Sequence, residues 1–257
     1  HFAPGVHAER DAAAAATSAS RGNDVLAGYV ARHPTRYRGF AMLAMHDAKA
    51  AAAELERCVR QLGFKGALIN GQTQGLYLDD ARYTPFWERV AALGVPIYLH
   101  PGHPQTMPAV YEGYPGLAGA IWGWMAETGG HALRLVFSGL FDRIPGLTVI
   151  VGHMGEALPY MLWRIDSRFG IVKPKVKLDK KPSQYIRENF MVTTAGVFAH
   201  EPLMCALAAL GDERVMFSVD YPLEFPDQAA AFIESAPLSE ERRAKICYGN
   251  AARVLKI

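Results

Sequence analysis

Short apolar segments alternate with amphipathic segments along most of the chain. The apolar segments have the length and near-continuous hydrophobicity of parallel strands that are covered on both faces. The amphipathic segments have helical periodicity, and several begin at Asp or Pro and end at Gly. The pattern predicts an additional short strand before Pro4 and six main strands, at 38–44, 65–70, 96–100, 147–153, 190–194 and 215–220.

Helices are predicted between these strands, and the alternation is typical of an α/β fold with a parallel sheet. A doubly wound sheet would suit six strands, but no strand runs into a GxGxxG or GxxxxGK[ST] turn. A (β/α)₈ TIM barrel, which needs eight strands, is therefore favoured. The helices are expected at the alanine run 12–16, at 47–62 and 85–93, in two stretches ending near 141, through Met161 and Arg164, and at 201–210, 226–235 and 239–254.

Polar residues stand at the ends of several predicted strands. His100 ends PIYLH, His153 ends LTVIVGH, Asp220 ends VMFSVD and Asn70 ends GALIN. A single histidine after a strand is commonly a loop residue, but the carboxyl ends of parallel barrel strands open on one face. An imidazole and a carboxylate brought together there would suit zinc, manganese or magnesium.

Glu156 follows His153 by three residues. In the first turn of a helix its charge could simply favour the helix dipole. Alternatively, its carboxylate could hydrogen-bond the imidazole and fix its tautomer, which is the interpretation that we prefer. Arg164 could pair with Glu156 or with Asp220, or form an ordinary surface ion pair.

Composition narrows the class of protein. The 257 residues suit one barrel, and 50% hydrophobic and 20% charged residues are ordinary for a soluble globular chain. A formal charge of +2 with no basic stripe makes nucleic acid and membranes poor partners. Three widely separated cysteines, expected to be buried, suit a reducing cytoplasm. A serine nucleophile is disfavoured because no GxSxG elbow occurs.

Several segments together resemble a known family. PIYLHPG, ETGGHALRLVFSGLFDRIPGLTVIVGHMGEALPYMLWRID, FSVDYPLE and YGNAARVLKI are similar to the amidohydrolase-related decarboxylases that act on γ-resorcylate, 2,3-dihydroxybenzoate and 5-carboxyvanillate. The resemblance implies an amidohydrolase-type barrel with one divalent metal ion (Zn, Mn or Mg) on His100 and Asp220. It implies that His153 is the active-site histidine, that Glu156 and Arg164 support it, and that the protein is a homodimer or homotetramer.

The start of the chain departs from the family pattern. In this family the first barrel strand carries a Glu, usually in a Glu-x-His pair, that completes the metal site. Here Ala3–Val6 resembles the loop after the second strand. We therefore expect residues 1–257 to form a single barrel domain that lacks its first strand and helix, either as part of a longer protein or as a shortened protein with an impaired metal site.

The expected activity is nonoxidative, reversible decarboxylation of an ortho-hydroxylated aromatic acid to the phenol and carbon dioxide. Asp220 is the expected proton donor, with His153 stabilising charge. Asn70, Tyr111 and Trp122 are candidate contacts for the aromatic ring, although the two aromatic residues could equally serve ordinary packing. Two alternatives stay open: metal-dependent hydrolysis of a lactone or amide, and a non-catalytic paralogue.

Overall fold

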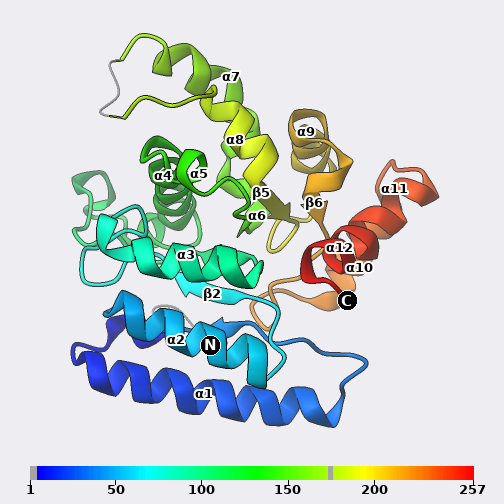
Figure 1. Ribbon diagram of the computed structural model, residues 1–257. Coiled ribbons are helices and arrows are strands. Elements are labelled where there is room, and N and C mark those ends of the chain that lie inside the picture. Colours follow the sequence, from blue (N-terminus) through cyan, green and yellow to red (C-terminus); the bar gives the residue numbers. More distant parts are fainter. Residues whose placement is uncertain (1–4, 173–175) are drawn as a thin grey trace. The chain divides into compact units, whose positions relative to one another are not determined.

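The structure is a computed structural model that describes residues 5–172 and 176–257 (Figure 1). The strand expected before Pro4 falls outside these residues. The chain packs as two compact units, one formed by His1–Leu135 with Ile144–Leu147, the other by Val136–Arg143 with Thr148–Ile257. None of the helices in the described part of the chain combines the length and the apolar run that crossing a bilayer demands.

The first unit is built on three parallel strands. β1 (Ala41–Met42) pairs with β2 (Ala67–Asn70), and β2 pairs with β3 (Ile97–His100). The register sets Asn70 beside His100, so two of the predicted site residues end neighbouring strands. The helices of this unit are α1 (Ala12–Arg32), α2 (Ala48–Gln61), α3 (Thr84–Leu93) and the start of α4 (Gly123–Phe137), with short 3-10 turns at Gly5–Ala8, Ala81–Tyr83, Ala109–Tyr111 and Pro115–Ala118.

Helix α1 is much longer than the alanine run that predicted it. Asp11 caps its start by accepting a hydrogen bond from the Ala14 N–H at 2.7 Å, and the helix then continues to Arg32. In the second half, residues 22–32, only Asn23 is buried. This half is held by tertiary contacts with α2, which lies beside it (Figure 1).

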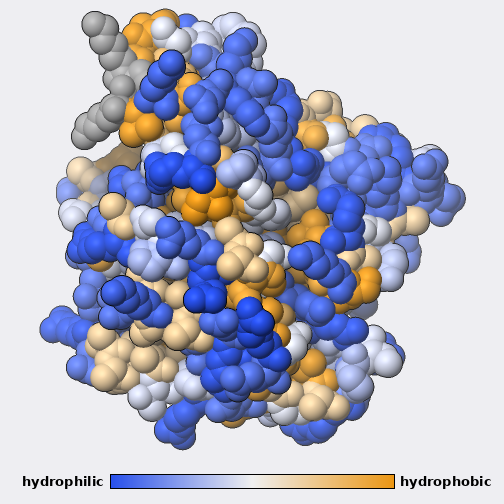
Figure 2. Space-filling model, viewed as in Figure 1, coloured by the Kyte–Doolittle hydropathy of each residue, from blue (hydrophilic) through white to orange (hydrophobic). Residues whose placement is uncertain are grey.

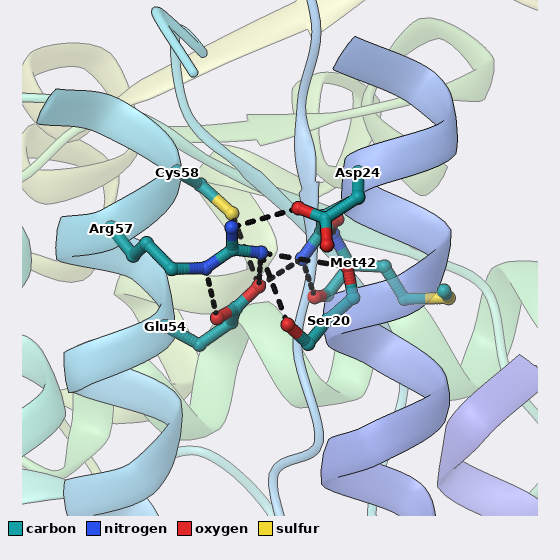
Figure 3. A network of polar contacts seen from close by, with 7 residues as sticks. Ser20, Asp24, Met42, Glu54, Arg57 and Cys58 are labelled. Atoms are coloured by element: carbon teal, nitrogen blue, oxygen red, sulfur yellow. Dashed lines mark hydrogen bonds and ion pairs between the residues drawn. The ribbon is translucent and has the colours of Figure 1, made fainter. Parts of the chain in front are cut away.

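A polar network joins α1 to α2 and β1 (Figure 3). The Arg57 guanidinium donates to Asp24 Oδ1 and Glu54 Oε1, both at 2.8 Å, and to Ser20 Oγ at 3.1 Å. The buried amide of Asn23 donates to the carbonyl of Met42 at 2.9 Å and accepts from its N–H at 2.8 Å. This amide therefore binds the backbone of β1 as a neighbouring strand would.

The second unit repeats the arrangement of three parallel strands. β4 (Val149–Val151) pairs with β5 (Phe190–Thr193), which pairs with β6 (Val215–Met216). In its core the Phe141 ring stacks on Tyr185 and meets Phe190 edge to face. Its helices are α5 (Leu140–Arg143), α6 (His153–Glu156), α7 (Leu158–Phe169), α8 (Pro182–Asn189), α9 (His200–Leu210), α10 (Pro226–Ser235), α11 (Glu240–Ala244) and α12 (Asn250–Leu255), with a 3-10 turn at Asp212–Arg214 and a π-helical turn at Lys245–Gly249.

The regular part of the last strand is shorter than predicted. β6 ends at Met216, so Asp220 lies four residues beyond it. The segment stays extended because other groups replace the strand ladder: the Phe217 N–H donates to the Ile246 carbonyl and the Ser218 N–H to Thr194 Oγ1, both at 2.9 Å. Asp220 is thus placed by side-chain and loop contacts.

The surface is mixed in character. Hydrophilic residues predominate on the face shown in Figure 2, with apolar residues in small groups between them. The expectation that all three cysteines are buried is wrong in part, since Cys58 is buried, Cys205 is half-buried and Cys247 is exposed. Burial raises the pKa of the Cys58 thiol to about 12, so this thiol is inert.

One buried histidine makes the first unit sensitive to acid. His131 on α4 is 1% exposed, and its Nε2 accepts a hydrogen bond from the Leu78 N–H at 2.9 Å. Its Nδ1 has no hydrogen-bond partner among the described residues. Burial, followed by the charge of Arg134, lowers the pKa of His131 from 6.5 to about 3. The folded protein therefore keeps this ring neutral at a pH where the unfolded chain protonates it.

The protein should lose stability as the pH falls below 6.5. Because the unfolded chain binds the proton first, His131 alone should lower the free energy of unfolding by about 2 kcal/mol between pH 6.5 and pH 5. Urea unfolding at pH 7 and pH 5 measures the loss in the free energy of unfolding. In His131→Gln this loss should be smaller by about 2 kcal/mol. His33→Gln, at an exposed histidine, should leave it unchanged. Equal pH dependence of all three proteins would contradict the assignment.

Candidate active site

The segment after β4 coils in the left-handed sense. Five consecutive residues, His153–Ala157, have φ between 49° and 83°. This conformation costs a non-glycine residue about 1–2 kcal/mol, so it persists only where the surroundings impose it. The single glycine of the run, Gly155, packs so closely on β5 that a Cβ would lie 2.7 Å from Val192 Cγ1. The turn is therefore held against the neighbouring strand.

This turn joins His153 to Glu156. The imidazole Nδ1 lies 2.6 Å from Glu156 Oε1, and the glutamate is 3% exposed. The predicted hydrogen bond between Glu156 and His153 is confirmed. The alternative, in which Glu156 stands in the first turn of a regular helix, does not fit the left-handed backbone. A carboxylate on Nδ1 fixes that nitrogen as the donor and leaves Nε2 directed elsewhere.

Nε2 of His153 points to the third member of the group. It lies 3.6 Å from Oδ2 of Asp220, whose own backbone is also left-handed with φ 78°. Gly196, at φ 65°, closes the site, because a Cβ there would lie 3.0 Å from His153 Cδ2 and 3.6 Å from Asp220 Oδ2. The structure therefore brings together three of the predicted catalytic residues, with the imidazole between two carboxylates.

The two carboxylates control the charge of the imidazole. Burial alone would lower the pKa of His153, but the Asp220 and Glu156 carboxylates outweigh it and raise the pKa to about 10. Burial also raises the pKa of Glu156, although the contact with His153 opposes this. At neutral pH the ring is a cation, so Nε2 holds a proton facing the Asp220 carboxylate.

A cavity adjoins His153 in the same unit. Its volume is about 460 Å³, enough for a small aromatic molecule. Most of its wall is apolar, and it lies between the left-handed turn and the start of α9. Its lining residues are His153, Met154, Ala157, Pro159, Tyr160, Val197, Glu201, Pro202 and Cys205.

In the first unit, Asn70 and His100 form a second polar pair. Asn70 is 2% exposed, and its Nδ2 lies 2.8 Å from Nδ1 of His100. The carbonyl of Pro101 lies 3.1 Å from the same ring nitrogen. Because both contacts engage Nδ1, a metal ion on this ring would bind Nε2, which requires the ring proton to sit on Nδ1.

The donor chemistry suits a divalent metal ion. An imidazole nitrogen from His100 and a carboxylate from Asp220 are ligand types that zinc and manganese accept. Within residues 5–172 and 176–257, however, no three His, Cys, Asp or Glu side chains gather as a ready ligand group. His100 in the first unit and Asp220 in the second therefore each offer a donor atom of a kind that such an ion accepts.

The other three predicted site residues, Arg164, Trp122 and Tyr111, differ in their exposure. Arg164 is exposed on α7, and no ion pair joins it to Glu156 or Asp220 among the described residues. The buried face of α7 carries Leu158, Pro159 and Leu162, so helical geometry turns residue 164 outward. Trp122 is 54% exposed, whereas Tyr111 is buried. The catalytic or binding roles of these three residues stay predictions.

The sequence analysis missed the glycines that shape both pairs. Gly196 lies against His153 and Asp220, and Gly71 lies against Gly102 beside Asn70 and His100. Each follows a predicted strand within a few residues, in the segments TTAG, NG and PG. A glycine directly after a strand that ends in a polar residue is the signal that could have revealed them.

The left-handed turn gives a direct stability prediction. Ala157 is exposed with φ 61° and ψ −2°, so Ala157→Gly removes strain without removing a buried contact. Glycine also makes the unfolded chain more flexible, which offsets part of this gain. The free energy of unfolding should therefore rise by about 0.5–1 kcal/mol. Urea unfolding measures it. Ala13→Gly in α1, at an exposed helical position, should instead lower stability by about 1 kcal/mol. Similar losses in both variants would contradict the prediction.

Comparison with known proteins gives the site a context. A family model described as amidohydrolase matches residues 2–257. The γ-resorcylate decarboxylase of Polaromonas sp. is 48% identical over 264 residues, which take in 99% of this chain and 81% of that relative.

Solved structures agree in fold. A crystal structure of 2,6-dihydroxybenzoate decarboxylase in complex with 2,6-dihydroxybenzoate is 44% identical, with a TM-score of 0.96 over 99% of this chain and 82% of the other. A dihydroxybenzoic acid decarboxylase from Polaromonas sp., with bound manganese and the inhibitor 2-nitroresorcinol, is 48% identical, with a TM-score of 0.94 over 99% and 80%. These similarities confirm the predicted α/β fold of amidohydrolase type.

Proposed function

Because this chain belongs to the amidohydrolase family, we propose that it catalyses the nonoxidative, reversible decarboxylation of an ortho-hydroxylated aromatic carboxylic acid. The observation that carries the proposal is the position of the His153 ring, 2.6 Å from Glu156 and 3.6 Å from Asp220, beside a cavity of aromatic size. Relatives that share 48% identity with the chain are γ-resorcylate decarboxylases, which supports the same reaction class.

One divalent metal ion, manganese, zinc or magnesium, is the proposed cofactor, and His100 and Asp220 would hold it. Manganese is present in the similar structure from Polaromonas sp.. When bound, such an ion would act as a Lewis acid that stabilises negative charge on the oxygen atoms of the substrate.

The residues of the chain supply the proton. Asp220 takes a proton from Nε2 of His153 and delivers it to the ring carbon that carries the substrate carboxylate. The bond from that carbon to the carboxylate then breaks, carbon dioxide leaves, and the bonding electron pair restores the aromatic ring. His153 holds a proton on Nε2, 3.6 Å from Asp220 Oδ2, and can replace the proton that Asp220 gives up. Glu156 keeps the ring aligned through Nδ1.

Substrate contacts and assembly are further parts of the proposal. Asn70, Tyr111 and Trp122 are proposed to contact the aromatic acid, and Arg164 to act in support of the site. A homodimer or homotetramer is supported by the exposed aromatic side chains Tyr160 and Trp163 on α7, which are 81% and 76% exposed. The cytoplasmic location stays a prediction.

Carbon dioxide release tests the proposal directly. Purified protein with Mn²⁺ should release carbon dioxide from 2,6-dihydroxybenzoate and form resorcinol, whereas benzoate, which lacks the ortho-hydroxyl group, should be inert. A panel of lactones and amides tests the alternative of hydrolysis, which the comparisons do not support. Hydrolysis of that panel without carbon dioxide release from any hydroxybenzoate would overturn the proposal, and neither activity would favour a non-catalytic paralogue.

A further inference from the structure

The ends of β2 and β3 hold the side chain of Asn70 against the ring of His100. Their Cα atoms are register partners, and the amide Nδ2 lies 2.8 Å from Nδ1 of the imidazole. The Pro101 carbonyl lies 3.1 Å from Nδ1 and 3.4 Å from Asn70 Nδ2. One ring nitrogen is thus faced by a side-chain amide and a backbone carbonyl together.

The surrounding backbone leaves this amide little freedom. The Gly71 N–H donates to the His100 carbonyl at 3.0 Å, and a Cβ on Gly102 would lie 3.0 Å from Gly71 Cα. On the other side, Nε2 of the buried His7 accepts the Asn70 N–H at 3.3 Å. The two strand ends therefore meet at van der Waals distance, and the amide is fixed beside the imidazole.

An amide at this place can select the tautomer of the ring. With its N–H₂ toward Nδ1, Asn70 donates to that nitrogen, and the ring proton then sits on Nε2. With its oxygen toward Nδ1, Asn70 accepts an Nδ1–H bond together with Pro101, and Nε2 carries the lone pair. Only the second arrangement leaves Nε2 able to bind a metal ion.

We propose that Asn70 is a positioning residue for His100, which fixes the orientation of the ring and selects the nitrogen that carries its proton. This role adds to the substrate contact suggested by the sequence, and it rests on the proposed function only where His100 acts as a metal ligand. The Pro101 carbonyl, 3.1 Å from Nδ1, can only accept a hydrogen bond, so it favours a proton on that nitrogen. The amide oxygen of Asn70 can accept from the same proton, whereas an aliphatic side chain cannot.

The test compares Asn70→Leu with Asn70→Asp and with a control at another buried asparagine. Asn250 is 1% exposed and donates to the carbonyls of Asp212 and Val215, so Asn250→Leu matches the loss of a buried amide away from His100. The first readout is the ¹⁵N NMR shifts of the His100 ring in the metal-free protein, assigned with His100→Gln. The second is the dissociation constant for Mn²⁺, from the electron paramagnetic resonance of free Mn²⁺.

Asn70→Leu should move the His100 ring shifts toward those of two exchanging tautomers and weaken Mn²⁺ binding about 10–100-fold. Asn70→Asp, whose carboxylate accepts an Nδ1–H bond, should restore binding to near the parental value. Asn250→Leu should change neither readout. If Asn70→Leu does not fold, Asn70→Ser, which is too short to reach the ring, takes its place with the same expectation.

Unchanged ring shifts and Mn²⁺ affinity in Asn70→Leu would overturn the inference, as would equal changes in Asn250→Leu. The NMR readout does not depend on turnover. A protein that shows the expected tautomer shift but no decarboxylation would refute the proposed function alone. If the parent protein decarboxylates the substrate but Asn70→Leu leaves the His100 ring shifts and the Mn²⁺ affinity unchanged, the positioning role alone is refuted.

Discussion

Asp220→Asn is expected to lower kcat for decarboxylation by about 10²–10⁴-fold, the range lost when a general acid is removed. Asparagine keeps the size of the side chain and one oxygen, but it cannot deliver a proton. The loss should therefore fall mainly on kcat, with a smaller effect on KM. The comparison is made on 2,6-dihydroxybenzoate with Mn²⁺, and Asp227→Asn, at an exposed carboxylate on α10, should turn over at the parental rate.

A second measurement separates proton transfer from binding. The parent protein should exchange the ring hydrogen of the phenol product with deuterated water, because decarboxylation is reversible and both directions pass a proton through the same group. Asp220→Asn should lose this exchange in parallel with turnover. If the variant exchanges the hydrogen at the parental rate, Asp220 is not the donor. His153, whose Nε2 lies 3.6 Å from Asp220 Oδ2, would then be the expected proton donor.

Glu156→Gln should lower kcat by about 10–100-fold while leaving bound Mn²⁺ unchanged. The glutamate touches the imidazole only at Nδ1, so its loss disturbs the ring without removing a predicted ligand. It also removes one of the two carboxylates that raise the pKa of His153, so that pKa should fall. Kinetics, elemental analysis and the NMR titration of His153 measure the three effects.

The matched control for Glu156 is Glu234, an exposed carboxylate on α10 of the same unit. Glu234→Gln should retain parental kcat and leave the pKa of His153 near its original value. Parental activity in Glu156→Gln would return Glu156 to a purely structural role in the left-handed turn. Loss of Mn²⁺ in that variant would show that Glu156 affects the metal site as well.

Periodicity predicted the strands and most helices because each buries a regular apolar face. It placed His100 at the last residue of β3, and the sequence spacing alone suggested the contact between Glu156 and His153. Helix α1 was underestimated because its second half depends on the Arg57 network and on Asn23, contacts that join residues far apart in the chain. Local pattern carries no information about such partners.

The geometry around His153 was beyond sequence reasoning for a related reason. The turn at His153–Ala157 places four non-glycine residues in a conformation that local preference disfavours, and packing against β5 imposes it. Local sequence preference therefore favoured a right-handed helical turn at His153–Glu156, whereas the backbone there is left-handed. The sequence left Glu156, Asp220 or a surface ion pair as partners of Arg164, and the helix that begins at Leu158 turns Arg164 to the surface.

The amide of Asn23 has a consequence for how the protein behaves at high concentration. A strand edge with unpaired N–H and C=O groups can template pairing with a strand of another molecule and so seed aggregation. Met42 directs both of its groups away from β2, and Asn23 takes up both of them. A single side chain on α1 thus occupies the two backbone groups of Met42 that intermolecular strand pairing would need at this position.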